Sequence, residues 1–284
     1  MTNRRTFLRT SLLGLAAAAP GTALGQFRLP PPPRIESKAC IIIDAMSGQA
    51  LFEKAADERR PVASTQKLLT ALVAVETVDM KKVITVVESD TKVEPSKMYL
   101  KTGERLPLNT LLQALLIKSY NDAAHCMARN VGGSVAGFAM LMNRRAAQLG
   151  MKSSHFVHPH GLPADGQYST ARDMSRVART AHYNTAIRNI VGRYEVIIKR
   201  GDGRTAKLRS TNYLLKPDSS YHLPQCTGMK TGFTNAAGKC LISVPRSADA
   251  RSSACCSVRG RRTARRRASW RGARARRCSS GRSA

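Results

Sequence analysis

The sequence predicts an α/β protein of the α+β type, in which an antiparallel sheet formed from both ends of the chain packs against a helical region. Short apolar, β-branched runs occur at 39–54 and again at 194–244, whereas helical periodicity fills most of 64–183. The 284 residues are 42% hydrophobic, which suits one large domain or two ordinary ones and excludes a wholly disordered chain. We find no internal repeat.

Residues 1–25 have the pattern of a twin-arginine-type signal peptide. The pair Arg4 and Arg5 precedes an apolar stretch at 12–19, and small residues mark a cleavage site before Gln26. The alternative is a basic amphipathic N-terminus on a cytosolic protein. We favour export to the periplasm or another extracytoplasmic compartment. No apolar run reaches the roughly 18 residues that cross a bilayer, so no transmembrane helix is expected in the mature chain.

A proline-rich segment at 26–34 contains four consecutive prolines and predicts a stiff, extended spacer. We therefore expect the folded body to occupy 35–245. It opens with two apolar runs at 39–44 and 50–54 that flank a turn signal. This pattern predicts a β-hairpin.

Helical patterns follow the hairpin. The segment that starts at Ser64 is apolar on nearly every face after its first turn, which predicts a buried helix. Caps and glycine stops delimit further helices. These run from Asn109 or Thr110 to Ile117, from Asn121 to Val131, from Ser134 to Leu149, and from 171 to 183, where Thr170 and Asp173 form a capping-box pattern.

Strand patterns return after the last of these helices. Two short apolar runs at 194–199 and 204–208 flank a glycine-containing turn, which predicts a second hairpin. Further strands are predicted near 228–231 and 239–244. Because these strands come from the far end of the chain, we expect them to join the first hairpin in one sheet.

The composition changes abruptly near Arg246. Residues 246–284 contain thirteen arginines and one acidic residue, and apolar periodicity stops. We expect this segment to be an irregular tail, disordered or read out of frame, that forms no strand. The alternative is an arginine-rich arm that binds anionic polymer or nucleic acid. Elsewhere the basic residues are scattered, so specific nucleic-acid binding is not expected, although an anionic polymer or membrane surface remains open.

No metal site is predicted. The cysteines of the folded body fit no zinc spacing and no CxxC motif, so we interpret them as core thiols or an unidentified disulfide. They are Cys40, Cys126, Cys226 and Cys240. Three histidines lie close in sequence, His155, His158 and His160, but no second cluster stands at ligand spacing.

Ser64 and Lys67 are the first candidates for chemistry. Their spacing places both side chains on one face at the start of a buried helix, where backbone N–H groups point outward. A serine hydroxyl becomes a nucleophile when a base takes its proton, and a lysine in an apolar cleft can stay neutral enough to do so. This pattern alone is weak, because an N-cap serine followed by a solvated lysine is common.

Two further elements strengthen the interpretation. Ser119 and Asn121 fall between two predicted helices, where both side chains can project from a short loop. Lys230, Thr231 and Gly232 lie on a late strand, where a cation, a hydroxyl and a position without a side chain suit a bound carboxylate. In this order, and on these elements, the three motifs together predict an active-site cleft.

With S-x-x-K, S-x-N and K-T-G in this order, the sequence resembles the serine β-lactamases and penicillin-binding proteins. More narrowly, it is identified as a member of the serine-type D-alanyl-D-alanine carboxypeptidases, the low-molecular-weight penicillin-binding proteins. The stretches that carry this resemblance are 44–49, 56–64, 115–124, 160–162, 165–174 and 228–234. The resemblance covers about 35–245 and implies a β-lactamase-like transpeptidase fold.

The resemblance also implies a role for each motif residue. Ser64 would attack the penultimate D-alanine of a peptidoglycan stem pentapeptide, form an acyl-enzyme and release the terminal D-alanine. Lys67 would be the general base. Ser119 would pass a proton to the leaving amine, and Asn121 would hold the substrate amide and the lysine.

The third motif would bind the substrate and polarise it. By similarity, Lys230 and Thr231 would bind the terminal carboxylate, and the backbone N–H groups of Ser64 and Phe233 would form the oxyanion hole. Gly232 would keep that approach open. No cofactor and no metal are implied, and β-lactams are expected to inhibit by acylating Ser64.

Two alternatives stay open. A class A β-lactamase shares the motifs but uses a glutamate between the second and third, and this chain has no Glu between Glu104 and Glu195. The other alternative is a non-catalytic module that holds cell-wall polymer or β-lactam without turnover. We favour the carboxypeptidase.

The tail departs from the family pattern. In this family one more apolar strand and a closing helix complete the sheet, and neither is visible after about residue 245. A second β-rich domain and a terminal amphipathic anchor are not visible either. We therefore expect the last strand and helix to be missing, which would leave the first strands without a neighbour.

Overall fold

The computed structural model describes residues 35–245 and 253–259. The predicted signal peptide, the spacer and most of the predicted tail lie outside the described residues. Within them, helices and antiparallel sheets form one α+β unit, and the predicted fold class is confirmed. No helix in these two stretches combines the length and the apolarity needed to span a bilayer.

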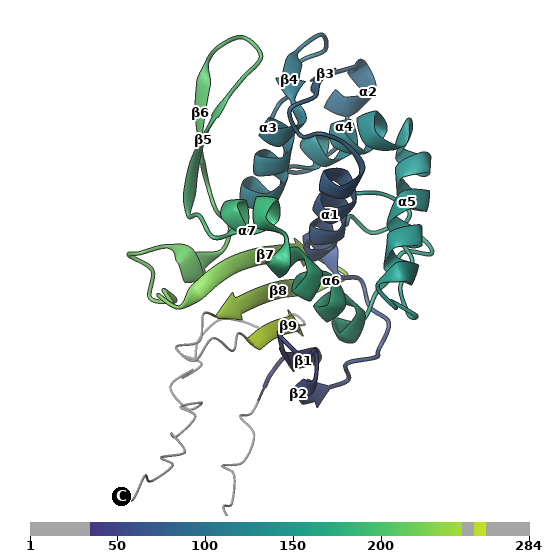
Figure 1. The fold of residues 1–284 in the computed structure, drawn as a ribbon, viewed down its shortest axis with the longest axis vertical. Helices are drawn as coiled ribbons and strands as arrows, with labels where there is room; N and C mark the ends of the chain where they lie inside the picture. Colours follow the sequence, from purple (N-terminus) through teal and green to yellow (C-terminus); the bar gives the residue numbers. More distant parts are fainter. Residues whose placement is uncertain (1–34, 246–252, 260–284) are drawn as a thin grey trace, which may run out of the picture. The chain divides into compact units, whose positions relative to one another are not determined.

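A five-stranded antiparallel sheet joins the two ends of the described chain (Figure 1). Its order is β2-β1-β9-β8-β7. The strands are β1 (Ala39–Asp44), β2 (Ala50–Lys54), β7 (Cys226–Thr234), β8 (Gly238–Pro245) and β9 (Ser253–Arg259). The sheet therefore forms from both ends of the sequence, as predicted.

β9 corrects the expectation that the tail forms no strand. It lies between β1 and β8 and pairs antiparallel with both, with Cys256 opposite Ile41 on one side and Ile242 on the other. Strand pairing is made by main-chain N–H and C=O groups, so the apolar periodicity sought in the sequence is not required for it. The last strand is present, and β1 keeps its neighbour. A closing helix would fall on 260–284, outside the described residues.

Helices and two small sheets form the rest of the unit. The helices are η1 (Ala63–Gln66), α1 (Lys67–Thr77), α2 (Glu88–Thr91), α3 (Leu108–Gln113), the π-helix η2 (Ala114–Lys118), α4 (Asn121–Gly132), α5 (Val135–Gln148), α6 (Ala171–Tyr183), α7 (Thr185–Val191) and η3 (Tyr213–Leu215). The small sheets pair β3 (Val83–Thr85) with β4 (Arg105–Pro107) and β5 (Glu195–Lys199) with β6 (Thr205–Arg209).

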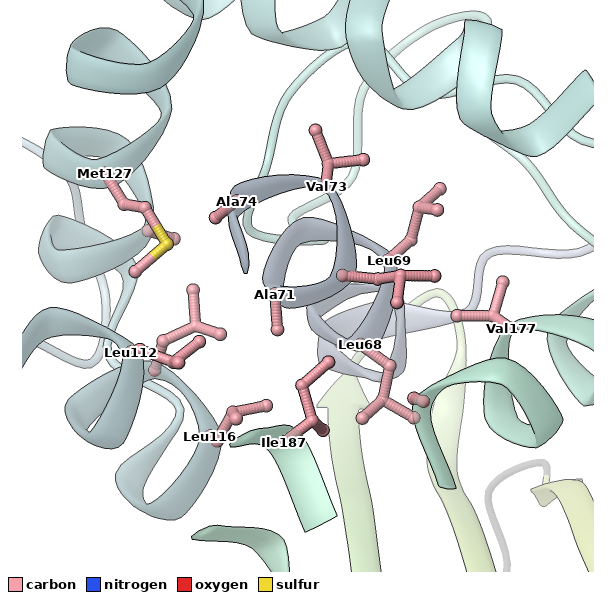
Figure 2. Packing of buried hydrophobic residues seen from close by; sticks show 14 of the residues in the cluster. Leu68, Leu69, Ala71, Val73, Ala74, Leu112, Leu116, Met127, Val177 and Ile187 are labelled. Atoms are coloured by element: carbon pink, nitrogen blue, oxygen red, sulfur yellow. The ribbon is translucent and has the colours of Figure 1, made fainter. Parts of the chain in front are cut away.

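The helix α1 is the centre of the core. Figure 2 shows Leu68, Leu69 and Ala71 pointing to different sides of α1, each toward side chains of other helices. The neighbours that it labels are Leu112, Leu116, Met127, Val177 and Ile187, from α3, η2, α4, α6 and α7. Burying one leucine stabilises the fold by about 1.5–3 kcal/mol. This packing fixes the position of α1, and hence of the residues at its start.

The helix α6 begins and ends where its sequence predicts, at 171 and 183. Thr170 caps the helix by accepting a hydrogen bond from the Asp173 backbone N–H at 3.0 Å, as its position predicts. Asp173 does not return the bond of a capping box; its carboxylate instead accepts from Ser153 and Ser154.

Cys40, Cys126, Cys226 and Cys240 are all buried, and the last three are free thiols. Burial raises the pKa of Cys226 and raises that of Cys240 to about 12, so these thiols stay protonated and unreactive. Of the two interpretations left open by the sequence, the core thiol is the one that the structure shows for Cys126, Cys226 and Cys240.

Candidate active site

Ser64 lies on a tight turn at the entrance to α1. The turn η1 is a 3-10 helix, in which the Thr65 N–H donates to the Val62 carbonyl, and Ala63 adopts a left-handed φ of 49°. A non-glycine residue in that region costs energy and is held there by its surroundings. The predicted helix start at Ser64 is thus a strained turn that leads into α1.

Lys67 is fully buried at the first position of α1. Its Nζ lies 2.9 Å from Ser64 Oγ, 2.7 Å from Asn121 Oδ1 and 2.6 Å from the His160 carbonyl oxygen. Burial lowers the pKa of Lys67 well below its ordinary value, and the nearby charge of Lys230 lowers it further. The first two sequence motifs therefore meet at this one nitrogen.

Asn121 is held in one orientation. Its Nδ2 donates to the Pro95 carbonyl at 2.5 Å and its backbone N–H to the Ser96 carbonyl at 2.8 Å, so Oδ1 is the atom that faces Lys67. Ser119 is half-buried and caps η2 with a left-handed φ of 68°. That turn ends the π-helix and allows α4 to begin at Asn121.

The third motif lies on β7, which packs against η1. Lys230 is 1% exposed, and its Nζ donates to the adjacent Thr231 carbonyl at 2.9 Å. Burial lowers the pKa of Lys230 to about 7. The hydroxyls of Thr231 and Thr211 lie 2.5 Å apart, and Phe233 is 58% exposed.

Gly232 allows β7 to pass close to the turn η1. A Cβ atom at this position would lie 2.8 Å from the Ser64 nitrogen and 3.0 Å from that of Thr65. Only a residue without a side chain allows this approach. The backbone of β7 thus runs beside the Ser64 N–H group.

The segment 158–161 supplies the remaining hydrogen-bond acceptor of Lys67. The three sequence motifs did not predict this contact. The carbonyls of the segment accept side-chain hydrogen bonds from three residues at the start of α1. The pairs are His158 with Gln66, Pro159 with Thr70, and His160 with Lys67. The sequence signal that could have found it is Gly161, where φ is 89° and a Cβ would lie 2.2 Å from the Ala63 carbonyl oxygen.

The imidazoles of His158 and His160 stack with their ring centroids 3.9 Å apart. Burial lowers the pKa of His160 to about 2, so it is neutral at physiological pH. Within 35–245 and 253–259, no group of three His, Cys, Asp or Glu residues is arranged to hold a metal ion.

This arrangement suits covalent acyl transfer. The Ser64 hydroxyl lies within hydrogen-bond distance of the buried Lys67 amine, whose pKa is low. A second buried amine, that of Lys230, lies on β7. A neutral amine can accept the Ser64 proton while its own N–H groups donate to Asn121 and His160.

The family model described as D-alanyl-D-alanine carboxypeptidase, peptidase S11, matches residues 27–256. The chain belongs to this family. The match includes Ser64, Lys67, Ser119, Asn121 and 230–233, and it ends inside β9.

Relatives of this carboxypeptidase family agree in sequence and fold. D-alanyl-D-alanine carboxypeptidase DacF of Bacillus subtilis is 32% identical over 73% of this chain, and DacA of Escherichia coli is 34% identical over 76%. The crystal structure of a D-alanyl-D-alanine carboxypeptidase from Mycobacterium tuberculosis matches with a TM-score of 0.75 and 29% identity, and covers 81% of this chain and 85% of its own. The chain spans about half the length of the two curated relatives, 54% of each.

Proposed function

We propose that this protein is a serine D-alanyl-D-alanine carboxypeptidase that removes the terminal D-alanine from peptidoglycan stem pentapeptides. The observation that carries the proposal is the contact of Lys67 Nζ with Ser64 Oγ at 2.9 Å, in a site where Lys67 is fully buried. Family membership supports the substrate class.

Acylation begins when neutral Lys67 takes the Ser64 hydroxyl proton. Ser64 Oγ then forms a bond to the carbonyl carbon of the penultimate D-alanine. The negative charge that develops on the carbonyl oxygen is stabilised by the N–H groups of Ser64 and Phe233. The amide C–N bond breaks, and the proton passes from Lys67 through Ser119 to the leaving amine of the terminal D-alanine.

Deacylation returns the enzyme to its starting state. Lys67, neutral again, takes a proton from a water molecule, which attacks the ester carbonyl. The ester bond breaks, and Ser64 Oγ recovers its proton. The products are the shortened stem peptide and free D-alanine.

Lys230 and Thr231 form the site for the terminal carboxylate. A cation and a hydroxyl on adjacent residues suit an anion, and a bound carboxylate favours the charged form of Lys230, whose pKa burial lowers to about 7. The same site takes the carboxylate of β-lactams, which act as inhibitors by acylating Ser64.

A serine β-lactamase is the alternative within the same fold. Such an enzyme would need a glutamate near the acyl-enzyme, and Glu195 is engaged elsewhere: it is an exposed residue of β5 and pairs with Lys207 and Arg209. We therefore favour slow release of β-lactams over turnover.

We also propose that the protein is exported by the twin-arginine route and works outside the cytoplasm. The support is the Arg4-Arg5 pattern, which lies outside the described residues, together with a family that acts on peptidoglycan. Replacing Arg4 and Arg5 by Lys in a full-length fusion to a periplasmic reporter should abolish export. Unchanged export would contradict this route.

The decisive experiment is labelling of the purified mature chain with a fluorescent penicillin over time, in wild type and Ser64→Ala. A persistent label that Ser64→Ala abolishes, with D-alanine release from a stem pentapeptide, supports the carboxypeptidase. Rapid loss of label with turnover of a chromogenic cephalosporin would indicate a β-lactamase. Equal reversible binding by both proteins, without covalent label, would indicate a binding module.

A further inference from the structure

We propose that Arg200 is a positioning residue for acylation: its ion pair with Glu104 fixes the segment 95–100, and that segment sets the orientation of Asn121 against Lys67. The inference rests on the proposed function, because it assigns a role in the same reaction. It concerns the β5–β6 hairpin, which none of the three motifs includes and which packs beside α3 and η2 (Figure 1).

The ion pair joins Arg200, in the turn between β5 and β6, to Glu104, the residue before β4. Arg200 Nε and one terminal nitrogen donate to the two carboxylate oxygens of Glu104, both at 2.7 Å. The side chains are only 13% and 7% exposed, and Glu104 also accepts from the backbone N–H groups of Gly201 and Lys101 at 3.2 Å. A buried two-point arginine–carboxylate contact is both stronger and more directional than an exposed ion pair.

The same guanidinium holds the segment 95–100 directly. It donates to the carbonyls of Met98 at 2.8 Å and Tyr99 at 3.1 Å. The carboxylate of Asp122, on α4, accepts from the N–H groups of Met98 and Leu100 at 2.9 and 3.3 Å. The segment is therefore held through its carbonyls by the hairpin and through its amides by α4.

This double attachment matters because the segment has an unfavourable backbone. Ser96 and Tyr99 are not glycines, yet their φ angles are 66° and 58°. Residues in this region need surrounding contacts to stay there. Without Arg200, the carbonyl side of the segment loses the contacts described above and the backbone can relax.

The segment passes its position to the catalytic amine through Asn121. The Pro95 carbonyl accepts from Asn121 Nδ2 at 2.5 Å, and the Ser96 carbonyl accepts from its backbone N–H at 2.8 Å. These bonds turn Oδ1 toward Lys67 Nζ, 2.7 Å away. A displaced segment would release the amide group and open the surroundings of Lys67 to water.

The consequence for Lys67 has a definite sign. Its pKa is depressed by burial first and by Lys230 second, and the other titratable groups that face it are the imidazoles of His158 and His160. Entry of water reduces the desolvation, so the pKa of Lys67 rises and less of it is neutral near pH 7. Acylation then slows at neutral pH and recovers at alkaline pH.

The test compares Arg200→Met with Arg204→Met. Arg204 lies in the same hairpin turn and pairs with Asp202, but these side chains are 68% and 42% exposed. For both variants and wild type, the rate constant for acylation by a fluorescent penicillin is measured as a function of pH. We expect Arg200→Met to lose about 10–100-fold at pH 7, with the acidic limb of the profile moved to higher pH, and Arg204→Met to match wild type.

A second variant covers the case in which Arg200→Met leaves Glu104 unpaired and fails to fold. The double variant Arg200→Met/Glu104→Gln removes both charges and should show the same shifted profile, with faster hydrogen exchange of the Asn121 amide. An unshifted profile in a folded variant, even at a lower rate, would overturn the proposal. If wild type itself is not acylated, the proposed function fails, and the Asn121 exchange still tests the positioning.

Discussion

The two buried lysines of the candidate active site, Lys67 and Lys230, have different hydrogen-bond partners. Lys67 is at the start of α1, where three oxygen atoms from η1, α4 and the 158–161 segment surround its Nζ. Lys230 is on β7, and its Nζ bonds to the carbonyl of the next residue on its own strand. The difference supports our proposal that the first amine, held in one geometry, transfers a proton, and that the second binds an incoming anion.

Removing the fixed amine should have the largest effect. Lys67→Met is expected to lower the acylation rate constant by about 10³-fold, because the Ser64 proton then lacks an acceptor. Stopped-flow measurement with a fluorescent penicillin checks this. Lys67→Arg sharpens the result, since arginine keeps the charge but does not release a proton at accessible pH. Activity retained by either variant would mean that another group is the base.

Removing the Lys230 amine, which we propose binds the substrate carboxylate, should act on affinity instead. Lys230→Met is expected to weaken binding of a stem peptide by about 10–100-fold, since hydrogen bonds to charged groups contribute roughly 1.5–3 kcal/mol. The maximal acylation rate should change less than KM. If Lys230→Met lowered the maximal acylation rate as much as Lys67→Met and left KM unchanged, the proposed division of roles between the two lysines would be wrong.

Moving β7, which carries Lys230, away from η1 should have a smaller effect on acylation. Gly232→Ala places a Cβ where only 2.8 Å separates it from the Ser64 nitrogen, so β7 must shift away from η1. We expect acylation to fall by about tenfold, because donors to the developing oxyanion are displaced. A crystal structure of the variant would show whether β7 moves. Wild-type rates would contradict the close approach.

The last prediction concerns the pH dependence of stability, which reports on Lys230 without any substrate. The pKa of Lys230 is about 7 in the folded protein and near 10.5 when unfolded, so the unfolded chain binds more protons between these values. The free energy of unfolding should therefore rise by about 2 kcal/mol from pH 7 to 9, and this rise should be smaller in Lys230→Met. Denaturant unfolding at both pH values measures it, and identical slopes in both proteins would contradict a depressed pKa.

Sequence patterns predicted what depends on local signals. The capped helix α6 and the hairpin of β1 and β2 were predicted at their observed positions. Ser64, Lys67 and Asn121 were predicted from side-chain chemistry and spacing, and hydrogen bonds join them in the structure.

Sequence patterns missed what the main chain does at long range. β9 pairs through its backbone, so its composition gave no strand signal. The His160 carbonyl contacts Lys67 from 93 positions away, and any residue type supplies a carbonyl. Arg200 lies 96 positions from Glu104, in a turn that the sequence presents only as a hairpin signal.

The place of β9 in the sheet has a consequence for how the chain folds. Ala39 pairs with Val258, and within the described residues β9 is the strand that joins the first hairpin to β8 and β7 in the sheet. Contacts between residues about 200 positions apart slow folding, because a long loop must close before they form. During synthesis, about 200 further residues must be made before the second edge of β1 is covered by β9. Until then that edge of β1 is unpaired, and an unpaired strand edge promotes aggregation.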